Sequence, residues 1–402
     1  MCPNGVEFKT LGEVTYWDKR FNEVERSMQP QIRKYHYYLA NELEALESPS
    51  GDVRILYTSN KIAYAEKDAV AENVVDAEVV AIPWGGNANI KYFKGEFITA
   101  DNRIAVVRDP SILSTKFVYY WLTKNQTEID SYYRGAGIKH PSMLKVLSLE
   151  IPLPPIEIQK KIVECLDKFS ALAAELQAEL QLRRKQYEYY RTQLLTPHSD
   201  CNSADNTDDC NWEWKTLGEI GKVCMCKRIL KNQTNNSSGI PFYKIGSFGG
   251  NADAYIDEET YLEYKHKYSY PNKGDILISA AGTIGKSVIF DGAPSYFQDS
   301  NIVWIANNES TVLNKYLYYY YQIVDWKVDD GGVIKRLYND NLKATKIAFP
   351  PLAEQARIVS ILDKFEALTT SLSDGIPAEQ AAQQKRYEYY RDLLLTFPRK
   401  AE

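Results

Sequence analysis

The sequence predicts an α+β protein in which two mixed α/β domains are joined by two long antiparallel helices and related by a pseudo-two-fold internal repeat. Three observations predict this fold class: an internal duplication, a long unbroken helical segment in each copy, and strand-like runs in the intervening segments. The chain has 402 residues, 44% of them apolar, which is enough for more than one core. The predicted parts are domain 1–153, helix 154–196, linker 197–211, domain 212–349, helix 350–396 and tail 397–402.

The duplication has a period near 200 residues, which indicates a repeated domain with an appendage rather than a solenoid. Residues 7–14 return as 213–220 with six of eight identical, 151–176 as 347–372 with 13 of 26, and 184–196 as 384–396 with nine of 13. The segments at about 15–130 and 221–330 share little. This divergence favours the interpretation that the central segments of the two copies recognise different targets. The alternative is neutral sequence change in surface loops.

Each copy is predicted to end in a long helix. Nothing breaks a helix between Pro155 and Thr196, and apolar residues recur every seven residues in two rows as far as Leu176, after which the apolar stripe drifts. Forty helical residues would extend roughly 60 Å, and the apolar stripe needs a partner, for which the second copy is the obvious candidate. Gly375 and Pro377 are expected to break that second helix near 374–377. The residues expected to pack are Ile158, Ile162, Phe169, Leu172, Leu176, Tyr187, Tyr190, Ile358, Ile361, Phe365, Leu368, Leu372, Tyr387 and Tyr390.

An antiparallel helix pair would place the two domains at opposite ends of a rod, facing the same side. Duplex DNA is the ligand that best suits two domains held at a fixed distance. Its strands are related by two-fold axes, and the two half-sites of a recognition sequence lie at a fixed separation. Residues 174–177 (Ala-Glu-Leu-Gln) are repeated directly at 178–181. One such unit is about one helical turn, or roughly 6 Å, so its gain or loss would change the rod by one or two base pairs. Helix propensity alone is the alternative explanation of this repeat.

The two domains read as mixed α/β structure followed by a polar linker. Strand-like runs occupy residues 77–82, 103–107, 275–279, 287–290 and 301–305, and helical pieces occupy 116–122 and 315–321. Residues 197–211 are polar and lack periodicity, as is typical of a linker.

Several loops combine glycine with a hydroxyl, an amide or a basic side chain, as DNA contacts require. The net charge of −5 argues against a protein that coats nucleic acid, but it is compatible with one that reads a short sequence. Each loop could also be an ordinary glycine turn, and the recurrence of residues 135–140 as 331–336 favours a DNA contact. The candidate DNA-binding residues are Trp84, Asn87, Lys91, Arg103, Lys139, His140, Lys244, Ser247, Ser279, Thr283, Lys286, Asn301, Lys335 and Arg336.

The patterns for catalysis fail. Residues 280–287 resemble a phosphate-binding loop, but Ala280 stands where glycine is required. The four histidines are scattered singly, and no Gly-x-Ser-x-Gly or Asn/Asp-Pro-Pro-Tyr motif occurs. Four cysteines could in principle bind a zinc ion, namely Cys201, Cys210, Cys224 and Cys226, but their spacing matches no standard zinc site. We therefore expect a non-catalytic chain with no metal and no cofactor of its own.

No apolar run approaches the roughly 20 residues that a bilayer span needs, and the first residues have no signal-peptide pattern. Six cysteines are too few for a disulfide scaffold. The expected location is therefore the cytoplasm, without a membrane partner.

The repeated motifs resemble those of a known family. Pro-Pro-x-x-x-Gln-x-x-Ile-Val-x-x-Leu-Asp-Lys-Phe begins at Pro154 and again at Pro350, and Tyr-Glu-Tyr-Tyr-Arg begins at Tyr187 and again at Tyr387. These segments resemble the conserved helical regions of type I restriction–modification specificity subunits. Residues 240–246, 279–286 and 300–303 resemble the target-recognition domain of that family. The first domain departs from the pattern, because residues 84–87 (Trp-Gly-Gly-Asn) stand where the second has Gly-Thr-Ile-Gly.

The resemblance implies a DNA-specificity subunit in which each target-recognition domain reads one half of a bipartite, asymmetric site in double-stranded DNA. The helices would set the unread spacer and dock two modification subunits, which methylate adenine with S-adenosylmethionine. Restriction subunits would bring ATP and Mg for translocation and cleavage. Three alternatives stay open: a specificity chain for a fused nuclease–methyltransferase or a methyltransferase-only system, a non-DNA coiled-coil scaffold, and an enzyme with an unrecognised site.

Overall fold

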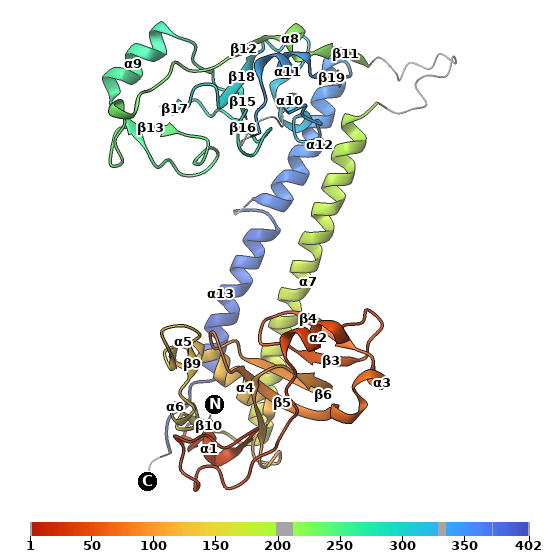
Figure 1. Ribbon diagram of the computed structural model, residues 1–402, viewed down its shortest axis with the longest axis vertical. Helices are drawn as coiled ribbons and strands as arrows, with labels where there is room; N and C mark the ends of the chain where they lie inside the picture. Colours follow the sequence, from red (N-terminus) through yellow and green to blue (C-terminus); the bar gives the residue numbers. More distant parts are fainter. Residues whose placement is uncertain (1, 198–211, 329–334, 372, 401–402) are drawn as a thin grey trace, which may run out of the picture. The chain divides into compact units, whose positions relative to one another are not determined.

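The computed structural model describes residues 2–197, 212–328, 335–371 and 373–400. Contacts divide the chain into two compact units, which are described separately. Unit 1 comprises residues 1–177 and 380–402, and unit 2 comprises 178–379. Each unit therefore combines one globular domain with portions of the long helices (Figure 1).

The globular part of unit 1 is built on a six-stranded sheet of order β2-β7-β5-β6-β3-β4. Its strands are β2 (Thr15–Trp17), β3 (Val53–Leu56), β4 (Ile62–Ala65), β5 (Val75–Pro83), β6 (Lys91–Thr99) and β7 (Asn102–Val107). Its helices are α1 (Leu11–Val14), α2 (Ala40–Leu46), α3 (Lys67–Val70), α4 (Thr115–Lys124), α5 (Gln126–Asp130) and α6 (Met143–Leu147), with a short pairing of β8 (Tyr133–Arg134) and β9 (His140–Pro141). The predicted strands at 77–82 and 103–107 lie in β5 and β7, and the predicted helix at 116–122 lies in α4.

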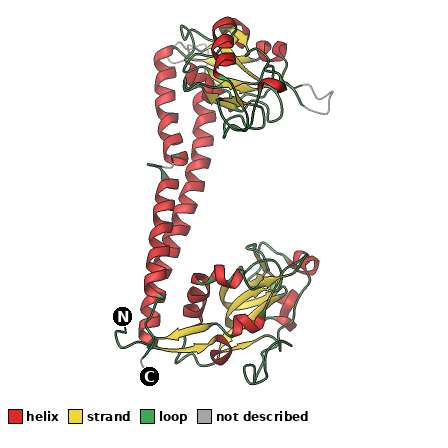
Figure 2. Cartoon of the chain, turned by 90° about the vertical axis from the view of Figure 1, so that its left-hand side faces the viewer, coloured by secondary structure: helices red, strands yellow, loops and turns green. Residues whose placement is uncertain are grey.

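Unit 2 has two smaller sheets, of orders β12-β18-β15-β16 and β14-β13-β17. The first contains β12 (Lys222–Cys224), β15 (Ile276–Ser279), β16 (Ser287–Ile289) and β18 (Ile302–Ala306), and the second contains β13 (Ile240–Tyr243), β14 (Tyr255–Ile256) and β17 (Tyr296–Phe297). The helices of the globular part are α8 (Leu217–Ile220), α9 (Glu258–Lys267), α10 (Asn314–Tyr320) and α11 (Asn339–Ala344). The predicted strand and helix segments of this copy therefore form as expected, and in both units strands and helices mix (Figure 2).

A two-stranded ribbon recurs in both units and explains the first repeated block. In unit 1, β1 (Glu7–Thr10) pairs antiparallel with β10 (Glu150–Leu153), and in unit 2, β11 (Glu213–Thr216) pairs with β19 (Lys346–Phe349) in the same register. Each ribbon leads into a capping box in which a glutamate accepts from the preceding threonine backbone, at 2.7 Å for both Thr10–Glu13 and Thr216–Glu219. The repeated Thr-Leu-Gly-Glu thus starts the same short helix twice.

The long helices are α7 (Ile156–Leu195), α12 (Leu352–Thr370) and α13 (Ile376–Leu394). The second helical segment is interrupted between Thr370 and Ile376, where the backbone of Gly375 lies too close to the carbonyl of Ala367 for a side chain to fit.

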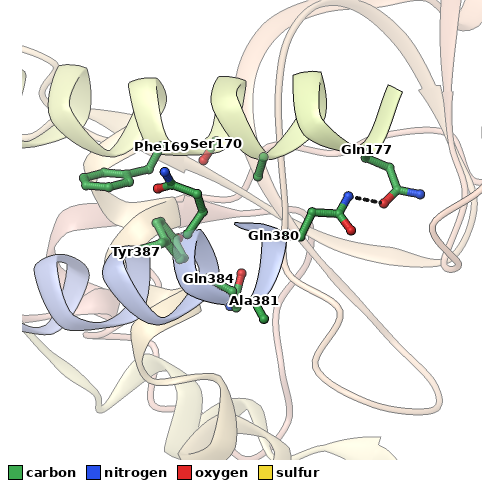
Figure 3. Close-up of a pocket in the computed structure, with 9 residues that line it drawn as sticks. Phe169, Ser170, Gln177, Gln380, Ala381, Gln384 and Tyr387 are labelled. Atoms are coloured by element: carbon green, nitrogen blue, oxygen red, sulfur yellow. Dashed lines mark hydrogen bonds between the residues drawn. The ribbon is translucent and has the colours of Figure 1, made fainter. Parts of the chain in front are cut away.

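The helices run antiparallel within each unit. In unit 1 the ring of Phe169 stacks on Tyr390 at 5.5 Å. Further along α7, Gln177 accepts from Gln380 at 3.0 Å (Figure 3). In unit 2 the equivalent pair, Tyr190 and Phe365, stacks at 5.7 Å. The predicted antiparallel pairing is therefore present in both units.

The residues predicted to pack fall into two groups, those that contact the other long helix and those that pack into a globular domain. The heptad pattern did not distinguish these groups. Ile162 and Ile358 are 1% and 2% exposed, but they belong to the cores of their own globular domains rather than to a helix–helix seam. Leu368 is 37% exposed and its neighbour Thr369 is buried, so a packing role for Leu368 stays a prediction. Leu372 lies outside the described residues.

The ends of the long helices enter globular cores as well. Leu195, at the end of α7, is fully buried in the core of unit 2, and Leu395, just after α13, is buried in the core of unit 1. The predicted tail is also part of unit 1, because Phe397 is buried there and the backbone of Val6 bonds with Pro398 and Lys400 at 2.9 and 3.0 Å. Each globular domain is thus held by the start of one long helical segment and the end of the other.

Candidate nucleic-acid interface

Three loop segments meet in unit 1 where β5 ends. Trp84 directly follows β5, and its N–H donates to the carbonyl of Asp101 at 2.9 Å. The imidazole Nδ1 of His140 donates to the carbonyl of Trp84 at 2.7 Å, and the N–H of Gly86 donates to the carbonyl of Lys139 at 2.9 Å. The structure therefore brings together the three segments that the sequence singled out separately in this domain.

The equivalent segments also meet in unit 2. The N–H of Ala280, directly after β15, donates to the carbonyl of Asn301 at 2.7 Å, and the N–H of Leu337 donates to the carbonyl of Ala280 at 2.9 Å. Ala281 and Arg336 form an isolated antiparallel bridge, and Arg336 Nη2 donates to Asn301 Oδ1 at 3.1 Å. We call this arrangement in each unit the three-loop cluster. Gly331 to Ile334, part of the predicted recurrent loop, lie outside the described residues.

Trp84 is the centre of the cluster in unit 1. Its half-buried ring lies 5.0 Å from the ring of His140, and the Nζ of Lys19 lies 4.7 Å above it. Cations this close to an indole face are attracted to its π-electrons. Asn87, Lys139 and His140 are exposed and remain candidates for DNA contacts.

Arg103 is a structural residue, which corrects its predicted role as a DNA contact. Its side chain is fully buried and forms an ion pair with the buried Asp18 at 2.7 Å and another with Asp101. Burial raises the pKa of Asp18, and the Arg103 guanidinium opposes that shift. A guanidinium enclosed in this way fixes β7 against β2 and does not reach a phosphate or a base.

Lys91 is also used internally. Its Nζ donates to the carbonyls of Thr58 and Asn89, at 2.9 and 3.3 Å, and burial lowers the pKa of this amine to about 8. This lysine therefore holds the loop after β3 against the start of β6 rather than extending toward a ligand.

Ser279 is a third correction, since it is 1% exposed in unit 2. Its Oγ donates to the carbonyl of Thr283 and accepts from the N–H of Lys286 at 2.9 Å, so it shapes the loop internally. Thr283 and Lys286 lie exposed on that loop, and the Nζ of Lys286 donates to the carbonyl of Phe248. Ser247 accepts from the N–H of Lys244 at 3.2 Å and stabilises a neighbouring turn.

A groove of about 670 Å³ lies beside the cluster in unit 2. It brings together three predicted residues, Lys244, Asn301 and Arg336, and adds residues that the sequence analysis missed. The most informative of those are Arg228 and Lys231, in a segment where the sequence Lys-Arg-Ile-Leu-Lys is followed by several amide residues. This combination of basic and amide residues was the signal that could have identified the segment.

Within the described residues, no group of three or more His, Cys, Asp or Glu side chains is placed to hold a metal ion. Cys201 and Cys210, which were considered for zinc, lie outside those residues. No helix in the described ranges is both long and apolar enough to span a bilayer.

The sequence profile of the type I restriction modification DNA specificity domain matches the chain twice, over residues 3–182 and 210–380. A putative type I restriction enzyme specificity subunit of Haemophilus influenzae is 49% identical over 353 residues, covering 85% of this chain and 87% of the relative. The EcoR124I/EcoR124II specificity subunit of Escherichia coli is 35% identical over 303 residues, covering 71% of each chain.

The fold also matches a solved structure. The type I restriction–modification S subunit from M. genitalium superposes with a TM-score of 0.57 at 17% identity over 98% of both chains. Two profile matches that span most of the chain, together with relatives of this similarity, show that the chain belongs to the family of type I restriction–modification DNA specificity subunits.

Proposed function

We propose that this chain gives a type I restriction–modification complex its DNA target, each unit reading one half of a bipartite, asymmetric site. The observation that carries the proposal is the recurrence of the three-loop cluster. One backbone hydrogen bond is the same in both units, from the N–H of Trp84 to Asp101 and from the N–H of Ala280 to Asn301. The side chains differ, with His140 bonded to the carbonyl of Trp84 in one unit and Arg336 bonded to Asn301 in the other. A shared loop arrangement that carries different side chains in the two units supports the proposal that the units read different half-sites.

The long helices are proposed to set the unread spacer and to dock two modification subunits. Tyr189 and Tyr389 occupy equivalent positions in the two copies and are 60% and 65% exposed. The two copies differ at many positions, so an exposed aromatic side chain at the same place in both supports one binding surface used twice. Adenine methylation, cleavage and their cofactors are assigned to the partner subunits, and this chain is proposed to be non-catalytic.

The test is to express the chain with its modification subunits and to map methylated adenines across the host genome by single-molecule sequencing. The proposal predicts one motif of two short half-sites separated by a spacer of fixed length and free sequence. A chain lacking residues 212–349 is the control, and it should not yield that motif. Methylation at a single continuous motif, or no methylation that depends on this chain, would refute the proposal.

A further inference from the structure

The groove of unit 2 is strongly basic although the chain as a whole is acidic. Four lining side chains are cationic, namely Arg228, Lys231, Lys244 and Arg336, and one, Asp299, is anionic. The net charge of the whole chain is −5. A local surplus of positive charge in a groove attracts an anionic polymer and raises its local concentration.

Two of these cations are held in fixed orientations. Arg228 Nε donates to Asp299 Oδ2 at 2.9 Å, and the side chain of Asp299 is only 19% exposed. Arg336 Nη2 donates to Asn301 Oδ1 at 3.1 Å. Each contact uses one edge of the guanidinium and leaves other N–H groups as donors for a second partner. Lysines around the groove lack such a planar fork.

A strained turn holds the two acceptors. Ser300, between Asp299 and Asn301, has a φ of 52°, which is unfavourable for a residue with a side chain, and the N–H of Asn301 donates to the carbonyl of Asp299 at 2.6 Å. Backbone strain of this kind persists where the surrounding structure enforces it, and it is concentrated at binding sites. Here the strained turn places Asp299, the acceptor for Arg228, and Asn301, the acceptor for Arg336, on either side of Ser300.

Arginines held in a fixed orientation are better suited to bind guanine than the other bases. The O6 and N7 atoms of guanine accept two parallel N–H groups from one guanidinium in the major groove, and this pairing is the commonest specific contact between a protein side chain and DNA. We propose that Arg228 and Arg336 determine specificity for guanine in the half-site read by unit 2, with Asp299 and Asn301 as positioning residues. The inference rests on the proposed function and adds a base identity to it.

Arginine-to-lysine substitutions separate base reading from phosphate binding. Lysine keeps the charge that a phosphate requires but lacks the fork that guanine requires. The assembled methyltransferase carrying Arg228→Lys or Arg336→Lys should therefore bind DNA at moderate salt almost as well as the wild type. Its discrimination at one guanine position should fall by about tenfold to hundredfold. Asp299→Asn should relax the same position as Arg228→Lys, and Lys267→Ala, which removes an exposed ion pair on α9, is the matched control.

The readout is the methylated motif of each variant, with binding to wild-type and single-mismatch duplexes measured at several salt concentrations. Relaxation at one G·C pair of a single half-site, with the other half-site unchanged, is the expected result. An unchanged motif, a uniform loss of affinity, or a wild-type half-site without any G·C pair would each overturn the inference while leaving the proposed function standing. A wild-type assembly without sequence-defined methylation would overturn both.

Discussion

Gln159 and Gln355 make the same three hydrogen bonds in two domains whose interiors have diverged. Both side chains are fully buried. The amide of Gln159 accepts from Ser114 N at 2.9 Å and donates to the carbonyls of Ile112 and Pro154 at 2.8 Å. That of Gln355 accepts from Leu313 N at 2.9 Å and donates to the carbonyls of Thr311 and Pro350 at 2.9 and 2.7 Å. Each glutamine thus fastens the start of a long helix to its own domain.

Replacing either glutamine should loosen one unit only. Gln159→Leu leaves a partly buried N–H and two carbonyls without their partner, so unit 1 should lose about 3 kcal/mol of stability. Hydrogen exchange would measure this as reduced protection in α4 and the first turns of α7, with α10 and α12 unchanged. Gln355→Leu should give the converse pattern. Gln177→Leu, which removes one exposed contact, is the control, and equal loosening of both units by Gln159→Leu would contradict the account.

The recurrent loops predict a matched pair of DNA-binding variants. Lys139 and Lys335 occupy equivalent positions and are exposed in their units. Lys139→Ala and Lys335→Ala should each weaken DNA binding by the assembled methyltransferase, at the half-site of the altered unit or at the backbone beside it, and a lost phosphate contact should lower the salt slope by about one. Binding titrations at several salt concentrations measure both effects. Lys67→Ala, which removes an exposed ion pair with Glu96, should leave the affinity unchanged. Wild-type affinity in both loop variants would count against these loops.

The exposed tyrosines predict how many modification subunits bind. If Tyr189 and Tyr389 form two equivalent docking surfaces, Tyr189→Ala and Tyr389→Ala should each weaken the binding of one subunit by about tenfold. Native mass spectrometry near the dissociation constant should then detect mainly complexes with one modification subunit, and the double variant should bind neither well. Thr192→Ala, an exposed position on the same helix, should retain both. Full occupancy in the double variant would place the docking surface elsewhere.

Buried tyrosines predict a loss of stability in alkali. Burial raises the pKa of Tyr35 from 10.0 to about 12, and its Oη has no hydrogen-bond partner among the described residues. A raised pKa in the folded state gives a stabilising contribution that is complete below pH 10 and is lost as the pH rises through 12.

Tyr35→Phe should therefore match or slightly exceed the wild type in stability at pH 8. It should then gain a growing advantage, up to about 2 kcal/mol, between pH 10 and 12. Urea unfolding at a series of pH values provides the measurement. A stability difference that does not change with pH would contradict the assigned burial.

The duplication and the helices could be predicted from the sequence because their signals are local. Heptad spacing up to Leu176 and the absence of a helix breaker predict α7, and Gly375 with Pro377 marks the interruption before α13. The ribbon of β1 and β10 could not be predicted, since its four-residue strands are about 140 positions apart and carry no alternating pattern. The exposure of Leu368 could not be predicted either. An α-helix has 3.6 residues per turn, so near the end of α12 the buried face no longer follows a repeat of seven residues.

The candidate site was predictable in part for a similar reason. Glycine-rich loops identified segments that do meet in space, such as Trp84 with His140. Which side chains point inward depends on partners far away in the sequence: Arg103 is buried because Asp18 receives it. Arg228 was missed because its partner, Asp299, is 71 residues away and no local pattern links the two.

If the helices set the interval between the two DNA-reading units, shortening α7 should shorten the spacer. Deleting Ala178–Gln181 removes one unit of the direct repeat and about one helical turn, or roughly 6 Å. Single-molecule mapping of methylated adenines should then find both half-sites unchanged and the spacer shorter by one or two base pairs. Altered half-site bases with the original spacer, or a spacer that does not respond to the deletion, would contradict the claim.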